Sequence, residues 1–172
     1  MKASKILIVD TSAILSGKTF DSDDLPMITC SGVDNELKPG GKDYQKYQLL
    51  KEKGLTVLTS DKKSIDFIRK TANETGDIDR LSKTDMEILA LAYQLRNEGK
   101  NPIILTDDYS IQNLAKFLDL DFENINQLKI TKKFKWTYRC RGCGKRYKDI
   151  VKTCPICGAE IKKVVSSEEN IK

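Results

Sequence analysis

The 172-residue chain contains no histidine. This absence excludes nucleophilic triads with an imidazole base, any histidine general base, and zinc sites with imidazole ligands. Catalysis by this chain would have to come from carboxylates, lysines, hydroxyls, thiols or a bound metal ion.

Long apolar segments are missing as well. No run approaches the ~18 apolar residues of a membrane span, and no signal-peptide pattern opens the chain. We therefore expect a soluble, cytoplasmic protein. Hydrophobic residues make up 39% of the chain and charged residues 32%, and the length suits one ordinary domain with a small accessory module.

Acidic residues are scarce at the C-terminal end. Residues 129–172 carry 13 Lys and Arg against 4 Asp and Glu, a net charge of +9. Residues 1–128 carry 17 against 21, a net charge of −4. A basic end on a mildly acidic body favours a nucleic-acid partner, the alternative being that the lysines serve solubility alone.

The first 123 residues alternate short apolar runs with helical patterns, which is typical of an α/β fold. Residues 6–9, 56–58 and 103–105 are brief, rich in branched residues and free of polar alternation, so they predict strands buried on both faces of a parallel sheet. Apolar spacing predicts a central helix around residues 86–95 and a final helix around 111–118. The segment 38–42, with Pro and two Gly, predicts a loop between two helices.

Four of the five cysteines form a doubled C-x2-C motif with ten residues between the pairs, at Cys140, Cys143, Cys154 and Cys157. A glycine follows each pair and permits a positive φ, so that backbone amides can point at the sulfurs. Four thiolates suit a structural zinc ion, the alternatives being two disulfides or a rubredoxin-like iron site. A module of this size needs the metal in order to fold. Cys30, the fifth cysteine, is interpreted as a small buried residue.

These patterns divide the chain into segments. We expect an α/β domain over residues 1–123, a linker over 124–135, a zinc ribbon over 136–165 and a disordered tail over 166–172. Around the cysteines, basic residues interleave with aromatics, a composition suited to phosphate contact and base stacking. The candidate RNA-contacting residues are Lys133, Lys135, Trp136, Tyr138, Arg139, Arg141, Lys145, Arg146, Lys148 and Lys152. The alternative for the aromatics, Tyr147 included, is that they cover the zinc site.

Carboxylates follow three of the predicted strands, namely Asp10, Asp61 and the pair Asp107-Asp108. Two more, Glu36 and Asp85, lie in helical patterns. Ligands bind beyond the carboxyl ends of parallel strands, and acids that converge there resist ionisation unless a cation is bound. Oxygen ligands select Mg²⁺ or Mn²⁺, ions that can activate water and stabilise the leaving oxygen in phosphodiester cleavage.

Each acid also has a structural alternative. Ser82-x-x-Asp85 matches a capping box, and Asp61 and Asp108 stand where helix N-caps belong. Glu36 could be an ordinary solvated residue. Asp10 is the exception, since Thr11 or Ser12 could cap the helix that follows it.

The ordered set of motifs resembles that of PIN-domain nucleases. It comprises Val9-Asp10-Thr11-Ser12, Asn35-Glu36-Leu37, Leu81-Ser82-Lys83-Thr84-Asp85 and Leu105-Thr106-Asp107-Asp108. The closer resemblance is to the NIN-one-binding endonuclease family, which matures the 3′ end of small-subunit ribosomal RNA. Thr75-Gly76-Asp77, the segment 106–113 and the adjoining ribbon carry that match, and the absence of long acidic insertions favours the archaeal type.

This resemblance implies a PIN fold whose Mg²⁺ or Mn²⁺ ligands are Asp10, Glu36, Asp85 and Asp108. Asp107 ranks lower, and Asp61 has no counterpart in the motif and returns to the capping interpretation. The implied activity is single-strand cleavage of precursor 16S rRNA in the immature small subunit, alongside protein assembly factors. The alternatives are a non-catalytic rRNA-binding assembly factor and a toxin-type PIN ribonuclease, against which the fused ribbon argues.

Overall fold

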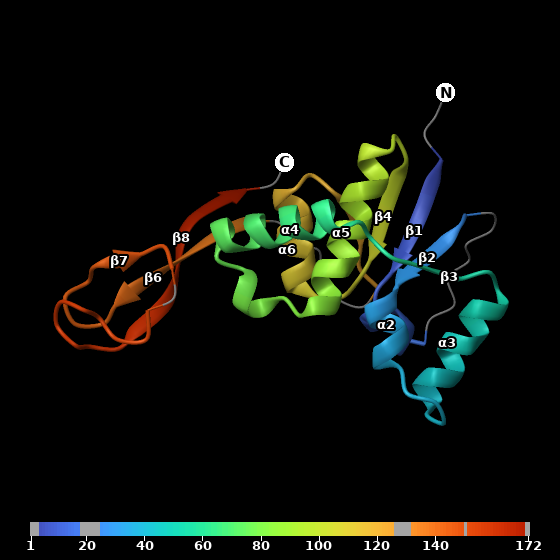
Figure 1. Cartoon of the computed structure of the whole chain (residues 1–172), viewed down its shortest axis with the longest axis horizontal. Coiled ribbons are helices and arrows are strands. Elements are labelled where there is room, and N and C mark those ends of the chain that lie inside the picture. The colour runs from blue at the N-terminus through green and yellow to red at the C-terminus, as the bar shows by residue number, and fades with distance from the viewer. Residues whose placement is uncertain (1–3, 18–24, 126–131, 150, 171–172) are drawn as a thin grey trace.

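The structure of the protein is a computed structural model that describes residues 4–17, 25–125, 132–149 and 151–170. For residues 132–136 and 167–170 it describes the backbone alone. Within these limits the chain folds into an α/β domain followed by a small antiparallel sheet that carries the cysteines (Figure 1).

A five-stranded parallel sheet forms the centre of the α/β domain, in the order β3-β2-β1-β4-β5. Its strands are β1 (Lys5–Val9), β2 (Met27–Cys30), β3 (Thr56–Leu58), β4 (Asn101–Leu105) and β5 (Asp121–Glu123). The two central strands pair Ile8 with Ile104, and neither side chain is exposed to solvent. The expected parallel α/β fold and its three predicted strands are confirmed, but the prediction that residues 56–58 are buried on both faces is wrong, because β3 is an edge strand and leaves Leu58 37% exposed.

Two strands went unpredicted because their sequences lack a clear signal. β2 spans four residues, and its threonine interrupts the apolar run although Thr29 is fully buried. Strand β5 buries Phe122 between an exposed Asp121 and an exposed Glu123, as an edge strand can. Both strands are held by pairing with neighbours far away in the sequence, which no local pattern reports.

Helices cover the sheet: α1 (Thr11–Leu15), α2 (Ser31–Glu36), α3 (Lys42–Glu52), α4 (Lys62–Thr75), the 3₁₀ turn η1 (Ile78–Arg80), α5 (Lys83–Asn97) and α6 (Tyr109–Phe117). Helix α5 is central, as predicted, because it buries residues over most of its circumference. The predicted loop separates α2 from α3, and Gly40 turns there with φ +95°. Cys30 is 1% exposed, and burial raises the pKa of its thiol to about 12, which confirms its interpretation as a buried residue.

The order of the strands creates a switch point between β1 and β4. From β1 the chain adds β2 and β3 on one side, then crosses to β4 and β5 on the other. Connections that leave adjacent parallel strands in opposite directions open a crevice beyond their carboxyl ends. Asp10 follows β1 and Asp108 lies just beyond β4, so both acids belong to this crevice.

The cysteine segment forms a three-stranded antiparallel sheet in the order β7-β6-β8. Its strands are β6 (Lys132–Cys140), β7 (Arg146–Tyr147) and β8 (Ile161–Asn170), and β6 pairs with β8 from Lys132↔Asn170 to Cys140↔Ile161. The expected linker over 124–135 and disordered tail over 166–172 are wrong for residues 132–135 and 167–170, which pair with each other as strands. Residues 126–131 and 171–172 of these two segments lie outside the described residues. The ladder satisfies the backbone of two polar segments that show no strand pattern of their own.

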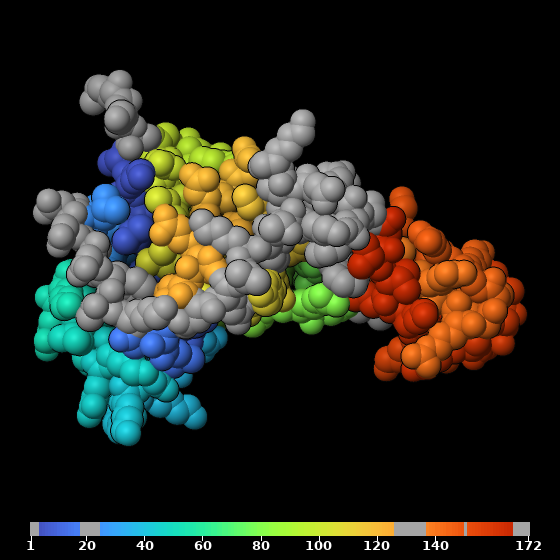
Figure 2. Space-filling model, turned by 180° about the vertical axis from the view of Figure 1, so that it is seen from behind, coloured from blue at the N-terminus to red at the C-terminus, as the bar shows by residue number. Residues whose placement is uncertain are grey.

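The ribbon protrudes from one side of the α/β domain, next to α4 and α6, and forms a lobe of its own (Figures 1 and 2). The Tyr138 hydroxyl of β6 donates a hydrogen bond to the Asp79 carboxylate of η1. Lys163 of β8 lies 4.0 Å from the same carboxylate. No helix among the described residues is long and apolar enough to cross a membrane.

Candidate active site and four-cysteine site

Asp10 lies at the floor of the crevice and is 4% exposed. Its Oδ2 accepts hydrogen bonds from the Ser12 hydroxyl at 2.8 Å, the Thr106 hydroxyl at 2.9 Å and the Ser12 amide at 3.4 Å. Asp10 is thus itself the N-cap of α1, and the expectation that Thr11 or Ser12 would cap this helix is wrong. The reason is that an aspartate at the strand end reaches the amide two residues further on.

Burial raises the pKa of Asp10 above its ordinary value of 3.8, although hydrogen bonds from Ser12 and Thr106 oppose the shift. The charge of Asp85 also raises it. A carboxyl group removed from water and placed beside another acid gains most from a bound cation, which would favour its ionised form.

Asp85 caps a helix and also interacts electrostatically with other acids. Its Oδ2 accepts the Ser82 amide at 2.6 Å and its own amide donates to the Ser82 hydroxyl at 3.1 Å, so the predicted capping box of α5 is present. Burial raises the pKa of Asp85, and the charges of Asp108 and Glu36 raise it further. The capping box therefore does not remove Asp85 from the acidic group.

Asp108 is the N-cap of α6, as its position predicted. Its Oδ1 accepts the Ser110 amide at 2.6 Å and the Ile111 amide at 3.4 Å. The Asp108 amide donates to the Thr106 hydroxyl at 3.0 Å, and the same hydroxyl donates to Asp10. One threonine thus connects the acids that follow β1 and β4.

Glu36 is the last residue of α2 and is exposed. It joins the acidic group from α2, whereas Asp10 and Asp108 follow strand ends. Its Oε2 accepts a hydrogen bond from the Thr11 hydroxyl at 2.9 Å. Helix α2 is held against α5 because Glu87 accepts the Gly32 amide at 2.9 Å. A Cβ on Gly32 would lie 2.6 Å from the Thr84 hydroxyl, so only glycine allows this approach.

The two remaining acids serve the fold. Asp107 is 7% exposed and accepts the Ile125 amide, which holds the chain that leaves β5. Asp61 is exposed and caps α4 by accepting the Ser64 amide at 2.7 Å, and this hydrogen bond lowers its pKa. The capping interpretation of Asp61 is confirmed.

The donor set of Asp10, Glu36, Asp85 and Asp108 consists of carboxylate oxygens, the ligands that Mg²⁺ and Mn²⁺ prefer. Among the described residues no three carboxylates bring an oxygen each within 4.8 Å of one another. Such spacing fits an ion that keeps several waters and binds through one or two carboxylates. The hydroxyls of Ser12 and Thr106 help to position these acids. No sequence pattern predicted this role, although both residues closely follow strand ends.

The four ribbon cysteines meet the geometry of a tetrahedral metal site. Their Sγ atoms all lie within 4.8 Å of one another, with Cys140–Cys157 at 3.3 Å and Cys143–Cys154 at 3.6 Å. Disulfide sulfurs are about 2.05 Å apart, whereas zinc–sulfur bonds of about 2.3 Å imply sulfurs a little under 4 Å apart. The structure therefore supports a metal site over the disulfide alternative.

Local geometry around the sulfurs also follows the expectation. The Gly142 amide points at Cys140 Sγ at 3.3 Å, and Gly144 and Gly158 adopt φ of +74° and +70°. The Tyr147 hydroxyl lies 3.1 Å from Cys154 Sγ and lowers the pKa of that thiol. Tyr147 thus covers the metal site, as the structural alternative for the aromatics proposed.

The candidate RNA-contacting residues fall into three groups. The side chains of Lys133, Lys135 and Trp136 lie outside the described residues. Tyr138 is 9% exposed, and its contact with Asp79 places it between ribbon and α/β domain rather than on a surface open to RNA. Six are exposed on the ribbon, namely Arg139, Arg141, Lys145, Arg146, Lys148 and Lys152. Of these, Arg141 pairs with Glu160 at 3.1 Å.

Comparison with known proteins agrees with this geometry. Residues 7–95 match the model of the PIN domain of ribonuclease. The chain is 40% identical over 158 residues to ribonuclease VapC1 of Thermoplasma acidophilum, which covers 92% of this chain and 77% of that protein. It is 34% identical over 160 residues to endoribonuclease Nob1 of Archaeoglobus fulgidus, covering 93% and 91% of the two chains. Against endoribonuclease Nob1 of Pyrococcus abyssi the identity is 31%, with 91% of each chain covered.

The fold and the acidic crevice define a PIN-domain nuclease. The Nob1 relatives match both the α/β domain and the ribbon, and this identifies one family within that class. The chain belongs to the NIN-one-binding family of PIN-domain endoribonucleases, the archaeal type with a C-terminal four-cysteine ribbon. Its activity is accordingly that of an endoribonuclease.

Proposed function

We propose that this endoribonuclease cleaves single-stranded precursor 16S rRNA at its 3′ end within the immature small ribosomal subunit, in a reaction that depends on Mg²⁺ or Mn²⁺. The observation that supports the cleavage chemistry is that Asp10 and Asp108, which follow β1 and β4 at the switch point, are joined by the Thr106 hydroxyl. The charges of Asp108 and Glu36 also raise the pKa of Asp85. The family's Nob1 members supply the substrate class. A substrate of this kind would place the protein in the cytoplasm with other assembly factors.

In the proposed reaction the divalent ion binds among Asp10, Glu36, Asp85 and Asp108, directly to one or two of these carboxylates and through water to the others. Such an ion activates water and stabilises the charge on the leaving oxygen when it is bound. The chain's own hydroxyls orient the ligands: Ser12 and Thr106 hold Asp10 at Oδ2, and Thr11 holds Glu36 at Oε2. The expected products carry 5′-phosphate and 3′-hydroxyl ends.

The ribbon contributes RNA binding rather than catalysis in this proposal. Four thiolates close a tetrahedral site and leave no coordination position for substrate, so zinc there is structural. The exposed cations around it, such as Arg146 and Lys152, suit contacts with RNA phosphates. Because such contacts release counterions, affinity should fall as salt is added.

A cleavage assay on RNA spanning the mature 3′ end of 16S rRNA tests the proposal. The wild type should make one discrete cut near that end with manganese or magnesium and none with EDTA. Asp10→Asn should abolish the cut while RNA affinity stays largely intact. Asp61→Asn is the matched control, because Asp61 caps α4 and asparagine caps about as well, so it should cut like the wild type.

The same assay separates the rival functions. Tight binding by the wild type with no metal-dependent product would favour a non-catalytic assembly factor. The second candidate is a toxin-type ribonuclease that cuts transfer RNA or messenger RNA, and the 40% identity to ribonuclease VapC1 favours it. A match over 92% of this chain necessarily includes the segment from Cys140 to Cys157, so that relative aligns with the ribbon too. Preferred cleavage of transfer RNA over the rRNA end would establish the second candidate.

A further inference from the structure

A pocket of about 410 Å³ lies directly beside the acidic group. Its lining includes Thr11 and Glu36, the hydrogen-bonded pair of the active site, and then continues away from the acids to Leu15, Lys38 and Tyr44. Small-ligand sites in proteins typically measure about 300–1,000 Å³. The pocket therefore has ligand-binding size and shares a wall with the catalytic centre.

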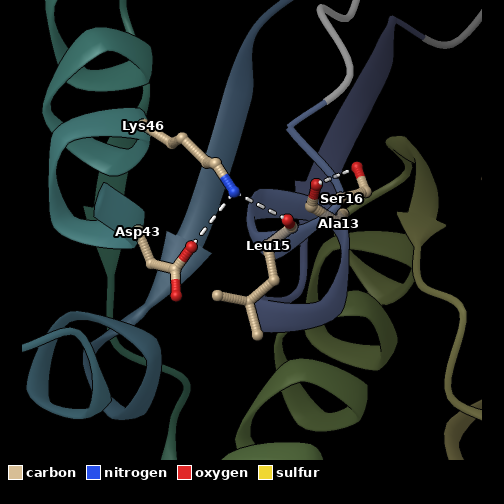
Figure 3. Close-up of polar contacts among 5 residues, drawn as sticks. All are labelled: Ala13, Leu15, Ser16, Asp43 and Lys46. Carbon is tan, nitrogen blue, oxygen red and sulfur yellow. Dashed lines mark hydrogen bonds and ion pairs between the residues drawn. The ribbon is translucent and has the colours of Figure 1, made fainter. Parts of the chain in front are cut away.

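Lys46 links the two sides of the pocket, α1 and α3. From α3 the Lys46 ammonium donates to the Leu15 carbonyl oxygen at 2.9 Å and pairs with Asp43 at 3.0 Å (Figure 3). At the end of α1, the Ser16 hydroxyl donates to the Ala13 carbonyl at 2.7 Å. The hydrogen bond from Lys46 to the Leu15 carbonyl links α1 to α3, whereas the other two contacts each lie within one helix or its end.

The side chains on the far side of the pocket combine apolar surface with one lysine, Lys38, and one aspartate, Asp43, whose carboxylate is paired with Lys46. Leu15 is 42% exposed and offers apolar surface to the pocket. Tyr44 is half-buried, with its ring held 6.5 Å from the ring of Tyr47, which is fully buried. Lys38 is exposed at the rim. An aromatic ring with a nearby cation is the combination that holds one nucleotide of a single strand.

We propose that this pocket is a nucleotide subsite, which binds the base next to the scissile phosphate between Tyr44 and Leu15 and contacts its phosphate with Lys38. The subsite rests on the proposed single-strand cleavage, and it adds a means of placing one phosphate at Asp10 and Glu36. It requires an unpaired base, because a base within a duplex cannot leave its stack without a cost in free energy. The subsite therefore accounts for a preference for single strands.

The test is a double-mutant cycle between protein and RNA, in manganese and on any single-stranded RNA that the wild type cuts. Tyr44→Leu removes the ring but keeps apolar volume, and Tyr44→Phe keeps the ring. An abasic nucleotide is placed on either side of the cleaved phosphate. Loss of the ring should raise KM about tenfold with little change in kcat, and Tyr44→Phe should resemble the wild type. On the abasic RNA that lacks the bound base, wild type and Tyr44→Leu should cut equally well.

Lysine variants provide the second arm of the test. Lys38→Ala should lower the slope of log affinity against log salt by about 0.7, the value for one phosphate contact on a single strand. Lys53→Ala, an exposed lysine at the opposite end of α3, should leave the slope unchanged. Additive effects of Tyr44→Leu and base removal at both positions would overturn the subsite. A generic RNA suffices for this cycle, so failure to prefer the 16S 3′ end would overturn the proposed substrate and leave the subsite standing.

Discussion

At the scale of single residues, a hydroxyl organises the active site. Thr106 is fully buried and donates to Asp10 while it accepts from the Asp108 amide. Neither acid could keep its position by charge alone, because two carboxylates repel each other. The threonine ties the Asp10 carboxylate, which follows β1, to the backbone of Asp108, which follows β4, before any cation arrives.

Thr106→Val tests this role, since valine keeps the shape and removes the hydroxyl. We expect cleavage to fall about 10- to 100-fold, the usual cost of losing a group that orients a metal ligand. The free energy of unfolding should fall by about 1–3 kcal/mol, because the Asp108 amide loses its acceptor. Steady-state kinetics across a manganese titration and urea unfolding measure the two effects.

Thr106→Ser is the control, because it retains the hydroxyl and should keep most of the activity. Wild-type kinetics in Thr106→Val would show that the hydroxyl does not position Asp10. A loss in both variants would instead indicate that the threonine methyl group, and hence packing, is what matters at this position.

At the scale of elements, the placement of Glu36 depends on how closely α2 approaches α5. Gly32 allows the contact, and Glu87 on α5 accepts both the Gly32 amide at 2.9 Å and the Ser31 hydroxyl at 3.3 Å. Negative charge at the start of α2 also complements the positive end of a helix. The packing of α2 against α5 thus positions Glu36 at the crevice.

Gly32→Ala should therefore disturb the active site from a distance. The new Cβ would meet Thr84 Oγ1 at 2.6 Å and Thr84 Cγ2 at 3.0 Å, so α2 must move away from α5. We expect the free energy of unfolding to fall by about 1–3 kcal/mol, with a loss of cleavage activity because Glu36 moves too. Thermal unfolding and cleavage rates measure the two effects.

A second substitution provides the control for the steric argument. Thr84→Ala removes two of the three atoms that the new Cβ would meet and leaves Glu87 Oε2 at 3.0 Å, so the double variant should regain part of the stability lost in Gly32→Ala. Additive losses in the double variant would contradict the argument and indicate that glycine is needed at position 32 for another reason.

At the scale of the whole molecule, the protein places its two sites on separate lobes. The ribbon lies at one end and α3, with the proposed subsite, on the side of the α/β domain away from it (Figures 1 and 2). Tyr138 and Lys163 attach the ribbon to η1 through Asp79. An RNA held by both sites would therefore extend across the α/β domain.

The separation of lobes predicts a selective effect of metal removal. Cys157→Ser should reduce bound zinc and unfold the ribbon, because a module this small lacks a sufficient core. Hydrogen exchange should become fast in β6, β7 and β8 and stay slow in β1, β4 and α5, and RNA affinity should fall. Cys30→Ala, which removes a cysteine outside the ribbon, should retain the zinc. Unchanged protection of the ribbon in Cys157→Ser would contradict a folding role for the metal.

The three scales differ in how far sequence patterns could predict them. The central strands, helix α5 and the capping box at Ser82 and Asp85 were predictable because neighbours within a few residues set their patterns. Strands β2 and β5 and the distal ends of β6 and β8 were not, since their partners lie far away in the chain. The role of Asp10 as an N-cap was not predicted for a different reason. Several neighbouring residues could have capped α1, and the hydrogen bond from Thr106 favours Asp10 in that role.

By itself the sequence determined the chemistry available to this protein. Without histidine, its reactive groups are limited to carboxylates, lysines, hydroxyls and thiols, and the doubled C-x2-C spacing favoured a four-thiolate site over two disulfides. Only the tertiary structure decided which acids share a crevice. It shows that Asp107 accepts the Ile125 amide, whereas the charge of Asp108 acts on Asp85. It also shows that the Tyr138 hydroxyl donates to Asp79 of the α/β domain. The physical reason is that the sequence gives the chemical type of each side chain directly, whereas its direction and surroundings depend on distant segments packed against it.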